Sequence, residues 1–166
     1  MKHLLLESGV ASANKYGEDL CGDFLSTVEQ EELTTIVLAD GLGSGVKANI
    51  LSTLTGKILS TLSASGVSME ESVNTIAQAL PVCSVRKLAY ATFTLLQVTP
   101  TAMAYLAQYD NPNAILLRQG KSVAYPISKR TIGDKEILES RFQLQIGDML
   151  ILMSDGVINA GMGKLT

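Results

Sequence analysis

Three aspartates stand at positions where a cation site could form. Asp40 ends the apolar run at residues 36–39, and Asp155 closely follows a similar run at residues 150–153. A glycine comes directly after each of these two aspartates, and its missing side chain lets the backbone approach a ligand. Asp23 offers a third carboxylate just before another apolar segment. A carboxylate at the end of a buried strand is costly unless its charge is paired or binds a metal.

The donor types in this set predict a hard cation. Oxygen ligands without histidine suit Mg²⁺ or Mn²⁺ better than Zn²⁺. The only histidine is His3, close to the N-terminus, which disfavours Ser-His-Asp and Cys-His catalysis. Two cations roughly 3.5–4 Å apart can hold a nucleophile and a phosphoester, and they form hydroxide near neutral pH. The scarcity of histidine is therefore compatible with metal-assisted catalysis.

A purely structural role for these aspartates is the alternative. An Asp-Gly pair after a strand is also a common turn or helix N-cap, and spacing alone leaves that alternative open. Asp110 and Asp148 lie in segments with ordinary hairpin-turn chemistry. We assign those two residues no role in the chemistry.

The glycine-rich segment at residues 41–46, G-L-G-S-G-V, allows a rival interpretation. A strand, a glycine-rich turn and a helix are typical of a dinucleotide-binding motif. Here the last glycine comes one residue early, and no acidic residue ends a second strand about twenty residues later. A Walker A loop is absent as well, because Lys47 lacks the required neighbours. The glycines could instead fit a tight strand-to-helix turn whose helix N-terminus faces a metal site or phosphate.

Composition limits the protein class. The 166 residues are 46% hydrophobic and 17% charged, which predicts one domain over residues 1–166 with an aliphatic core. A net charge of −3 disfavours nucleic-acid binding. No apolar run is long enough for a signal peptide or a membrane span, so we expect a cytoplasmic protein. Cys21 and Cys83 lack metal-site spacing and are expected to be buried free thiols, although a disulfide stays open.

The periodicity of apolar residues predicts two helices followed by an antiparallel meander. Helical spacing runs from residue 47 to 65, and a second helix follows from 69 to about 80. Ser68 and Glu71 form a capping box for the second helix, and Pro81 closes it. Strands are predicted at residues 4–12, 24–28, 33–39, 90–98, 102–109, 115–118, 122–125, 141–145 and 149–153, with the last two forming a hairpin. This order indicates an α+β fold rather than a parallel βαβ sheet.

Several segments together resemble a known family. The string L-A-D-G-L-G-S-G-V-K-A at residues 38–48 looks like the D-G-x-G-x-G-x-x-A signature of the stage II sporulation protein E-like branch of metal-dependent protein phosphatases, the protein phosphatase 2C superfamily. The segments at residues 22–24, 90–94 and 147–157 are similar to further family motifs. A fourth segment, residues 110–120, matches with Asp110-Asn111 where Gly-His is usual. The resemblance runs in order from about residue 9 to 160.

The resemblance implies a fold and a site. The fold would be a two-sheet antiparallel β-sandwich flanked by helices. Asp40 would bridge two Mn²⁺ or Mg²⁺ ions, Gly41 would give one of them a backbone carbonyl, and Asp155 would bind the other. Asp23 matches the N-terminal acidic position, and Asp40 and Asp155 are the residues on which catalysis would depend.

The family also implies an activity. It would be hydrolysis of phosphoserine or phosphothreonine on a regulatory phosphoprotein, such as an anti-sigma antagonist or a stressosome-type protein. The alternative is a non-catalytic protein-binding module with a degenerate metal site, and a dinucleotide-binding protein is third.

Two departures from the family pattern stand out. Relatives carry a final strand with another metal-binding Asp, whereas this sequence ends at Thr166, so we expect a domain that lacks its C-terminal part and an incomplete site. No arginine precedes Asp23 to hold a phosphate, and we expect Lys15 to be simply exposed.

Overall fold

The computed structural model describes residues 5–80 and 90–160. Cys83 and Pro81, on which two of the predictions depend, lie outside these residues, as does His3. None of the helices that the described residues form is both long enough and apolar enough to cross a bilayer.

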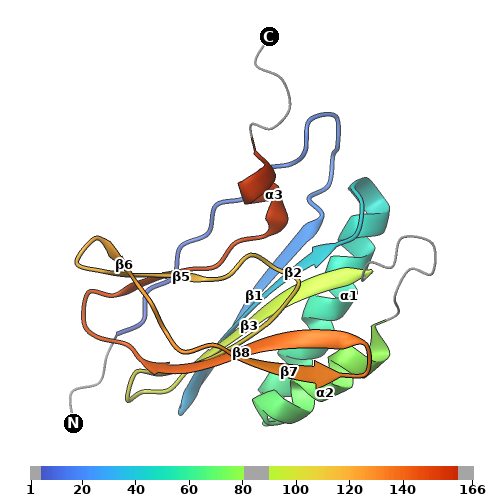
Figure 1. Ribbon diagram of the computed structural model, residues 1–166. Coiled ribbons are helices and arrows are strands. Elements are labelled where there is room, and N and C mark those ends of the chain that lie inside the picture. Colours follow the sequence, from blue (N-terminus) through green and yellow to red (C-terminus); the bar gives the residue numbers. More distant parts are fainter. Residues whose placement is uncertain (1–4, 81–89, 161–166) are drawn as a thin grey trace.

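Two antiparallel sheets form the framework (Figure 1). In the larger sheet the strand order is β1-β2-β3-β4-β8-β7, and in the smaller it is β6-β5-β9. The strands of the larger sheet are β1 (Asp23–Gln30), β2 (Leu33–Gly41), β3 (Ala91–Val98), β4 (Met103–Tyr109), β7 (Ser128–Ile132) and β8 (Lys135–Gln143). Those of the smaller sheet are β5 (Ile115–Arg118), β6 (Lys121–Val123) and β9 (Met149–Ile151).

Helices cover one face of the larger sheet. Helices α1 (Gly45–Ala64) and α2 (Met69–Ala79) lie behind it in the view of Figure 1, and the short helix α3 (Asp155–Asn159) follows β9. Leu59 of α1 and Ile76 of α2 pack with Phe93 of β3, and all three are almost fully buried. Ser68 caps α2 by accepting a hydrogen bond from the Glu71 amide at 3.2 Å, as the capping-box pattern predicts.

A second apolar layer joins the two sheets. Leu96 and Leu106 of the larger sheet pack against Leu116 of the smaller one. The ring of Tyr125 stacks on Phe142 with centroids 4.7 Å apart, and its hydroxyl donates to the Ala114 carbonyl at 2.6 Å. Alternating side chains of the larger sheet thus pack against the helices on one face and against the smaller sheet on the other. The predicted α+β class, the two antiparallel sheets and both helices are confirmed.

Two sequence predictions for strands are wrong, and one strand was missed. Residues 5–12 contain no regular secondary structure and are exposed, because no neighbouring strand pairs with them. Strand β7 was not predicted; its sequence S-K-R-T-I is mostly polar because it forms the edge of the sheet. The hairpin of residues 141–145 with 149–153 does not form: β8 pairs with β4 and β7, whereas β9 pairs with β5 in the other sheet.

Candidate functional site

The paired ends of β1 and β2 bring two of the predicted carboxylates together. Asp23 lies directly opposite Asp40 in the antiparallel register. Phe24 and Ala39, one residue along each strand, face the helices, so alternation directs Asp23 and Asp40 toward the other face. These two aspartates therefore lie side by side at the end of the sheet.

The glycine-rich segment makes a tight turn from β2 into α1. A side chain on Gly41 would overlap the backbone of Ala48, and the Gly41 amide donates to the Gly22 carbonyl at 3.0 Å. Gly43 and Gly45 have φ angles of +101° and +66°, which other residues rarely adopt. The tight-turn interpretation agrees with this geometry. The dinucleotide interpretation does not, because β2 and β3 are antiparallel rather than parts of a βαβ unit.

The chain returns to the same place after β9. The Ser154 hydroxyl donates to the Asp23 carboxylate at 2.6 Å, although the two residues are 131 positions apart. Asp155 begins α3, and its carboxylate lies near enough to Asp40 to raise the pKa of Asp40. All three predicted aspartates thus meet at one end of the two sheets, and Gly41 is next to them.

Burial and the crowding of negative charge together set the electrostatics of this cluster. Burial, and after it the carboxylates of Asp23 and Asp155, raise the pKa of Asp40 from 3.8 to about 8. Among the described residues no basic side chain offsets this shift. A divalent cation would offset it, and three carboxylates are the donors that Mg²⁺ and Mn²⁺ prefer, so the cluster fits such an ion.

The carboxylates are close together without forming a ready-made cage. In the described part of the chain, no three acidic, histidine or cysteine side chains converge in a geometry that would itself hold an ion. Asp155 is exposed on the short helix α3, so its side chain has room to adjust. Binding would therefore require small movements of these side chains.

Sequence reasoning missed several polar residues around the cluster. Ser154 binds Asp23, and Asn49 of α1 donates to the Cys21 carbonyl at 2.9 Å, which anchors the helix to the segment before β1. The Ser44 hydroxyl donates to Glu18 at 2.7 Å instead of capping α1. Ser154 belongs to the repeated small-residue-Asp-Gly pattern, which is a signal that could have indicated it. Cys21 is a free thiol, as expected, but it is only partly buried.

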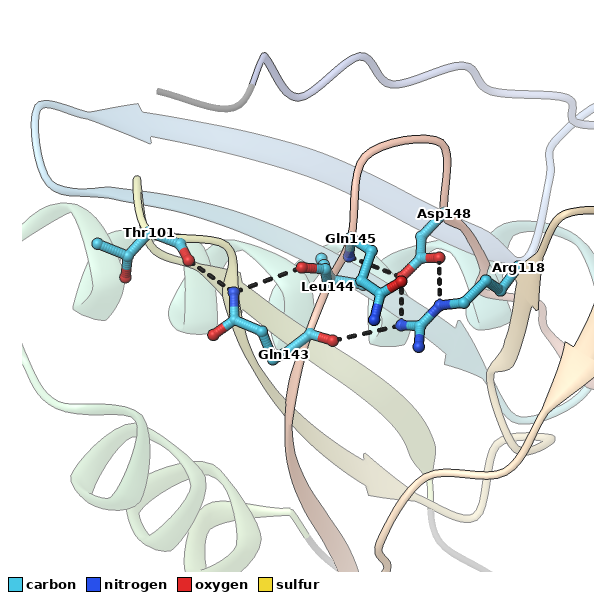
Figure 2. A network of polar contacts seen from close by, with 6 residues as sticks. All are labelled: Thr101, Arg118, Gln143, Leu144, Gln145 and Asp148. Atoms are coloured by element: carbon cyan, nitrogen blue, oxygen red, sulfur yellow. Dashed lines mark hydrogen bonds and ion pairs between the residues drawn. The ribbon is translucent and has the colours of Figure 1, made fainter. Parts of the chain in front are cut away.

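Asp148 holds two parts of the sheet framework together instead of lying in a simple hairpin turn. Figure 2 shows Arg118 donating two hydrogen bonds of 2.8 Å to its carboxylate. The Gln145 amide adds another at 2.8 Å, and the Asp148 side chain is only 2% exposed. Hydrogen bonds from Arg118 lower the pKa of Asp148. The pair links the end of β5 to the turn before β9, which is where the chain changes sheets.

Comparisons with solved structures define the class of protein first. The structure is similar to the PP2C phosphatase domain, with a fragment of the regulatory domain, of the cell fate determinant SpoIIE from Bacillus subtilis. The TM-score is 0.77 and the identity 26%, over 94% of this chain and 47% of that one. RsbX in complex with magnesium shares the fold, with a TM-score of 0.67, 24% identity, and coverage of 87% and 71%. The fold is therefore that of PP2C phosphatase domains.

The sequence then identifies the family within that class. The model of the family "Stage II sporulation protein E (SpoIIE)" matches residues 30–165, so the chain belongs to this family. Stage II sporulation protein E of Bacillus subtilis (strain 168) is 28% identical over 164 residues. That alignment covers 94% of this chain but only 19% of the relative. The chain thus spans about a fifth of that curated relative, and the resemblance seen in the motifs is confirmed.

Proposed function

We propose that this chain is a metal-dependent protein serine/threonine phosphatase that acts on a cytoplasmic regulatory phosphoprotein of the anti-sigma antagonist or stressosome type. The observation that carries the proposal is the meeting of Asp23, Asp40 and Asp155 at one end of the two sheets. The SpoIIE family and the PP2C fold support the activity. Similar solved structures belong to a cell fate determinant, to magnesium-bound RsbX and to the bacterial stressosome, which supports this substrate class.

The site residues would have distinct roles. Asp40, Asp155 and Asp23, with the carbonyl of Gly41, would hold two Mn²⁺ or Mg²⁺ ions. Such ions lower the pKa of water and stabilise the charge that develops on a phosphoryl group. Ser154 fixes the orientation of the Asp23 carboxylate through its 2.6 Å hydrogen bond. The tight turn at Gly41 brings the backbone of α1 against the same strand end.

The reaction would be hydrolysis of a phosphate monoester. The water oxygen forms a bond to phosphorus while the bond from phosphorus to the seryl or threonyl oxygen breaks. That departing oxygen takes up a proton, and inorganic phosphate is released. The residues that the structure describes include no histidine that could act as a base, so the carboxylates and their cations would carry this chemistry.

Phosphate release with and without Mn²⁺ tests the proposal. We expect release from an aryl phosphate or a phosphoserine peptide with Mn²⁺, and none after chelation. Asp40→Asn is expected to lower the rate by at least roughly 100-fold, because loss of a group that only orients a metal ligand already costs up to about that much. Asp148→Asn is the matched control, because it makes the same chemical change outside the cluster and should keep the activity. Equal rates for Asp40→Asn and the wild type would contradict the proposal.

A partner-binding module with a degenerate metal site is the second candidate. The absence of a ready-made cage among the described residues favours it. Titration calorimetry separates the two functions: no Mn²⁺ binding and no phosphate release would favour the module. Binding of Mn²⁺ that Asp40→Asn abolishes would favour the enzyme.

A further inference from the structure

The Thr92 hydroxyl lies beside Asp40 and has no part in the roles given above. Thr92 of β3 is directly opposite Asp40 of β2. The neighbouring residue Phe93 packs toward the helices, so Thr92 faces the other side of the sheet, as Asp40 does. Side chains opposed in this way have Cβ atoms about 4.5–5.5 Å apart. Asp23, Asp40 and Thr92 therefore form one polar row across three strands.

A buried amide holds this hydroxyl in place. Thr92 donates to the Asn111 side-chain oxygen at 2.6 Å, and the Asn111 amide nitrogen donates to the Thr94 hydroxyl at 3.0 Å. Asn111 is only 8% exposed, and it lies in the loop that joins the two sheets. The Gln108 side chain fixes that loop by donating to the Pro112 carbonyl at 2.9 Å. Asn111 thus links the carboxylate end of the larger sheet to the loop that leads into the smaller one.

The bond to Asn111 decides what Thr92 can offer to the carboxylate cluster. A hydroxyl has one proton and two lone pairs, and here the proton is directed at Asn111. The oxygen can therefore only accept a hydrogen bond on its other side. The Asp40 carboxyl group keeps at least one acceptor oxygen whether or not it is ionised. Two neighbouring acceptors cannot bond to each other, but a water molecule can donate one proton to each.

We propose that Thr92 and Asp40 together orient a water molecule, with Thr92 as a positioning residue that Asn111 fixes. A water that donates to both oxygens has its lone pairs directed away from the sheet. Those lone pairs then face the space where a cation or a phosphoryl group would bind. The use of this water in catalysis rests on the proposed function, whereas its position does not.

Thr94 provides a matched control. It bonds to the same Asn111 amide and lies on the same face of β3, but its opposite residue is Leu38 rather than Asp40. Thr92→Val and Thr94→Val each remove one hydroxyl from this network while keeping the side-chain shape. Both variants should lose similar thermal stability, and Thr92→Val alone should affect the carboxylate cluster.

A high-resolution crystal structure of the metal-free protein is the direct test. We expect a water within hydrogen-bonding distance of both the Thr92 oxygen and an Asp40 carboxylate oxygen. The water should persist in Thr92→Ser and Thr94→Val and be absent from Thr92→Val. A wild-type structure without a water shared by these two oxygens would overturn the proposal, whether or not the protein is a phosphatase.

Metal binding gives an independent readout. We expect Thr92→Val to weaken Mn²⁺ binding about 10-fold in titration calorimetry, within the range found for groups that orient metal ligands. Thr92→Ser and Thr94→Val should bind as the wild type does. Equal affinity for Thr92→Val and Thr94→Val would contradict the role of Thr92. Failure of the proposed function looks different, since the shared water would then be present while no variant released phosphate.

Discussion

Asp40 and Asp148 show two opposite ways of keeping a carboxylate inside this molecule. Asp148 receives two hydrogen bonds from Arg118 and one from the Gln145 amide, and its pKa is lowered. Burial of Asp40, and after it the neighbouring carboxylates of Asp23 and Asp155, raise its pKa to about 8. A paired carboxylate supports the fold, whereas a crowded one is unfavourable until a cation arrives. The difference separates a structural acid from a candidate functional one.

Addition of Mn²⁺ should give the largest difference in thermal stability between variants of Asp40 and of Asp148. At about 100 times its dissociation constant, a ligand that binds only the folded state adds about 2.7 kcal/mol of stability. For a chain of this size we expect Tm to rise by about 5–10 °C. The wild type and Asp148→Asn should both show the rise, and Asp40→Asn should not. Calorimetric scans with and without Mn²⁺ measure it, and a rise in Asp40→Asn would place the ion elsewhere.

Loss of the Asp148 charge should reduce stability without disturbing the carboxylate cluster. In Asp148→Asn the Arg118 guanidinium loses the opposite charge and one of its two acceptor oxygens, so we expect Tm to fall by on the order of 5 °C. Thermal unfolding followed by circular dichroism measures this change. Glu136→Gln is the control, because its ion pair with Lys129 is largely exposed and should contribute little. An unchanged Tm in Asp148→Asn would show that the pair does not hold the sheets together.

Acid should remove the contribution of Asp148 to the stability of the fold. Because Arg118 lowers the pKa of Asp148 in the folded state, its stabilisation is complete above the unfolded pKa of about 3.9. It is lost as the pH falls through the lower folded-state value. The Tm difference between the wild type and Asp148→Asn should therefore be constant from about pH 8 to 5 and shrink below about pH 4. A difference that persists in strong acid would rule out the ion pair as its source.

The smallest expected effect is a gain in stability, in the metal-free Asp40→Asn variant. Without metal, the raised pKa of Asp40 means that folding at neutral pH must protonate a carboxyl group that is ionised in the unfolded chain, and Asp40→Asn removes this cost while keeping the size of the side chain. We expect Tm to rise by roughly 2–4 °C at neutral pH, the shift that about 1 kcal/mol produces. Thermal unfolding in the presence of a chelator measures it. If Asp40→Asn is less stable than the metal-free wild type, the raised pKa of Asp40 does not destabilise the metal-free protein.

Most elements of the fold could be predicted from the sequence because their signals are local. Helical spacing and the Ser68 cap gave α1 and α2, and β-branched runs gave β2 and β3. The failures concern segments whose state depends on distant partners. Residues 5–12 have no neighbouring strand, and polar β7 exists only because β8 pairs with it.

The candidate site divides in the same way. The repeated pattern of apolar residues, Asp and Gly was enough to select Asp40 and Asp155 from the sequence. It could not indicate that Asn111 would fix Thr92 beside Asp40, because that contact depends on the register of two strands and on a loop between two sheets. Nor could it separate Asp148 from a simple turn residue, since Arg118 is 30 positions away.

The sequence alone determined which carboxylates are candidates, the class of cation they suit, and the family to which the chain belongs. Only the tertiary structure decided which acids meet each other and which meets an arginine. The physical reason is that the sequence fixes which residues are acidic and where along the chain they stand. The free energy of keeping each of them ionised depends on neighbours that strand pairing brings from distant parts of the chain.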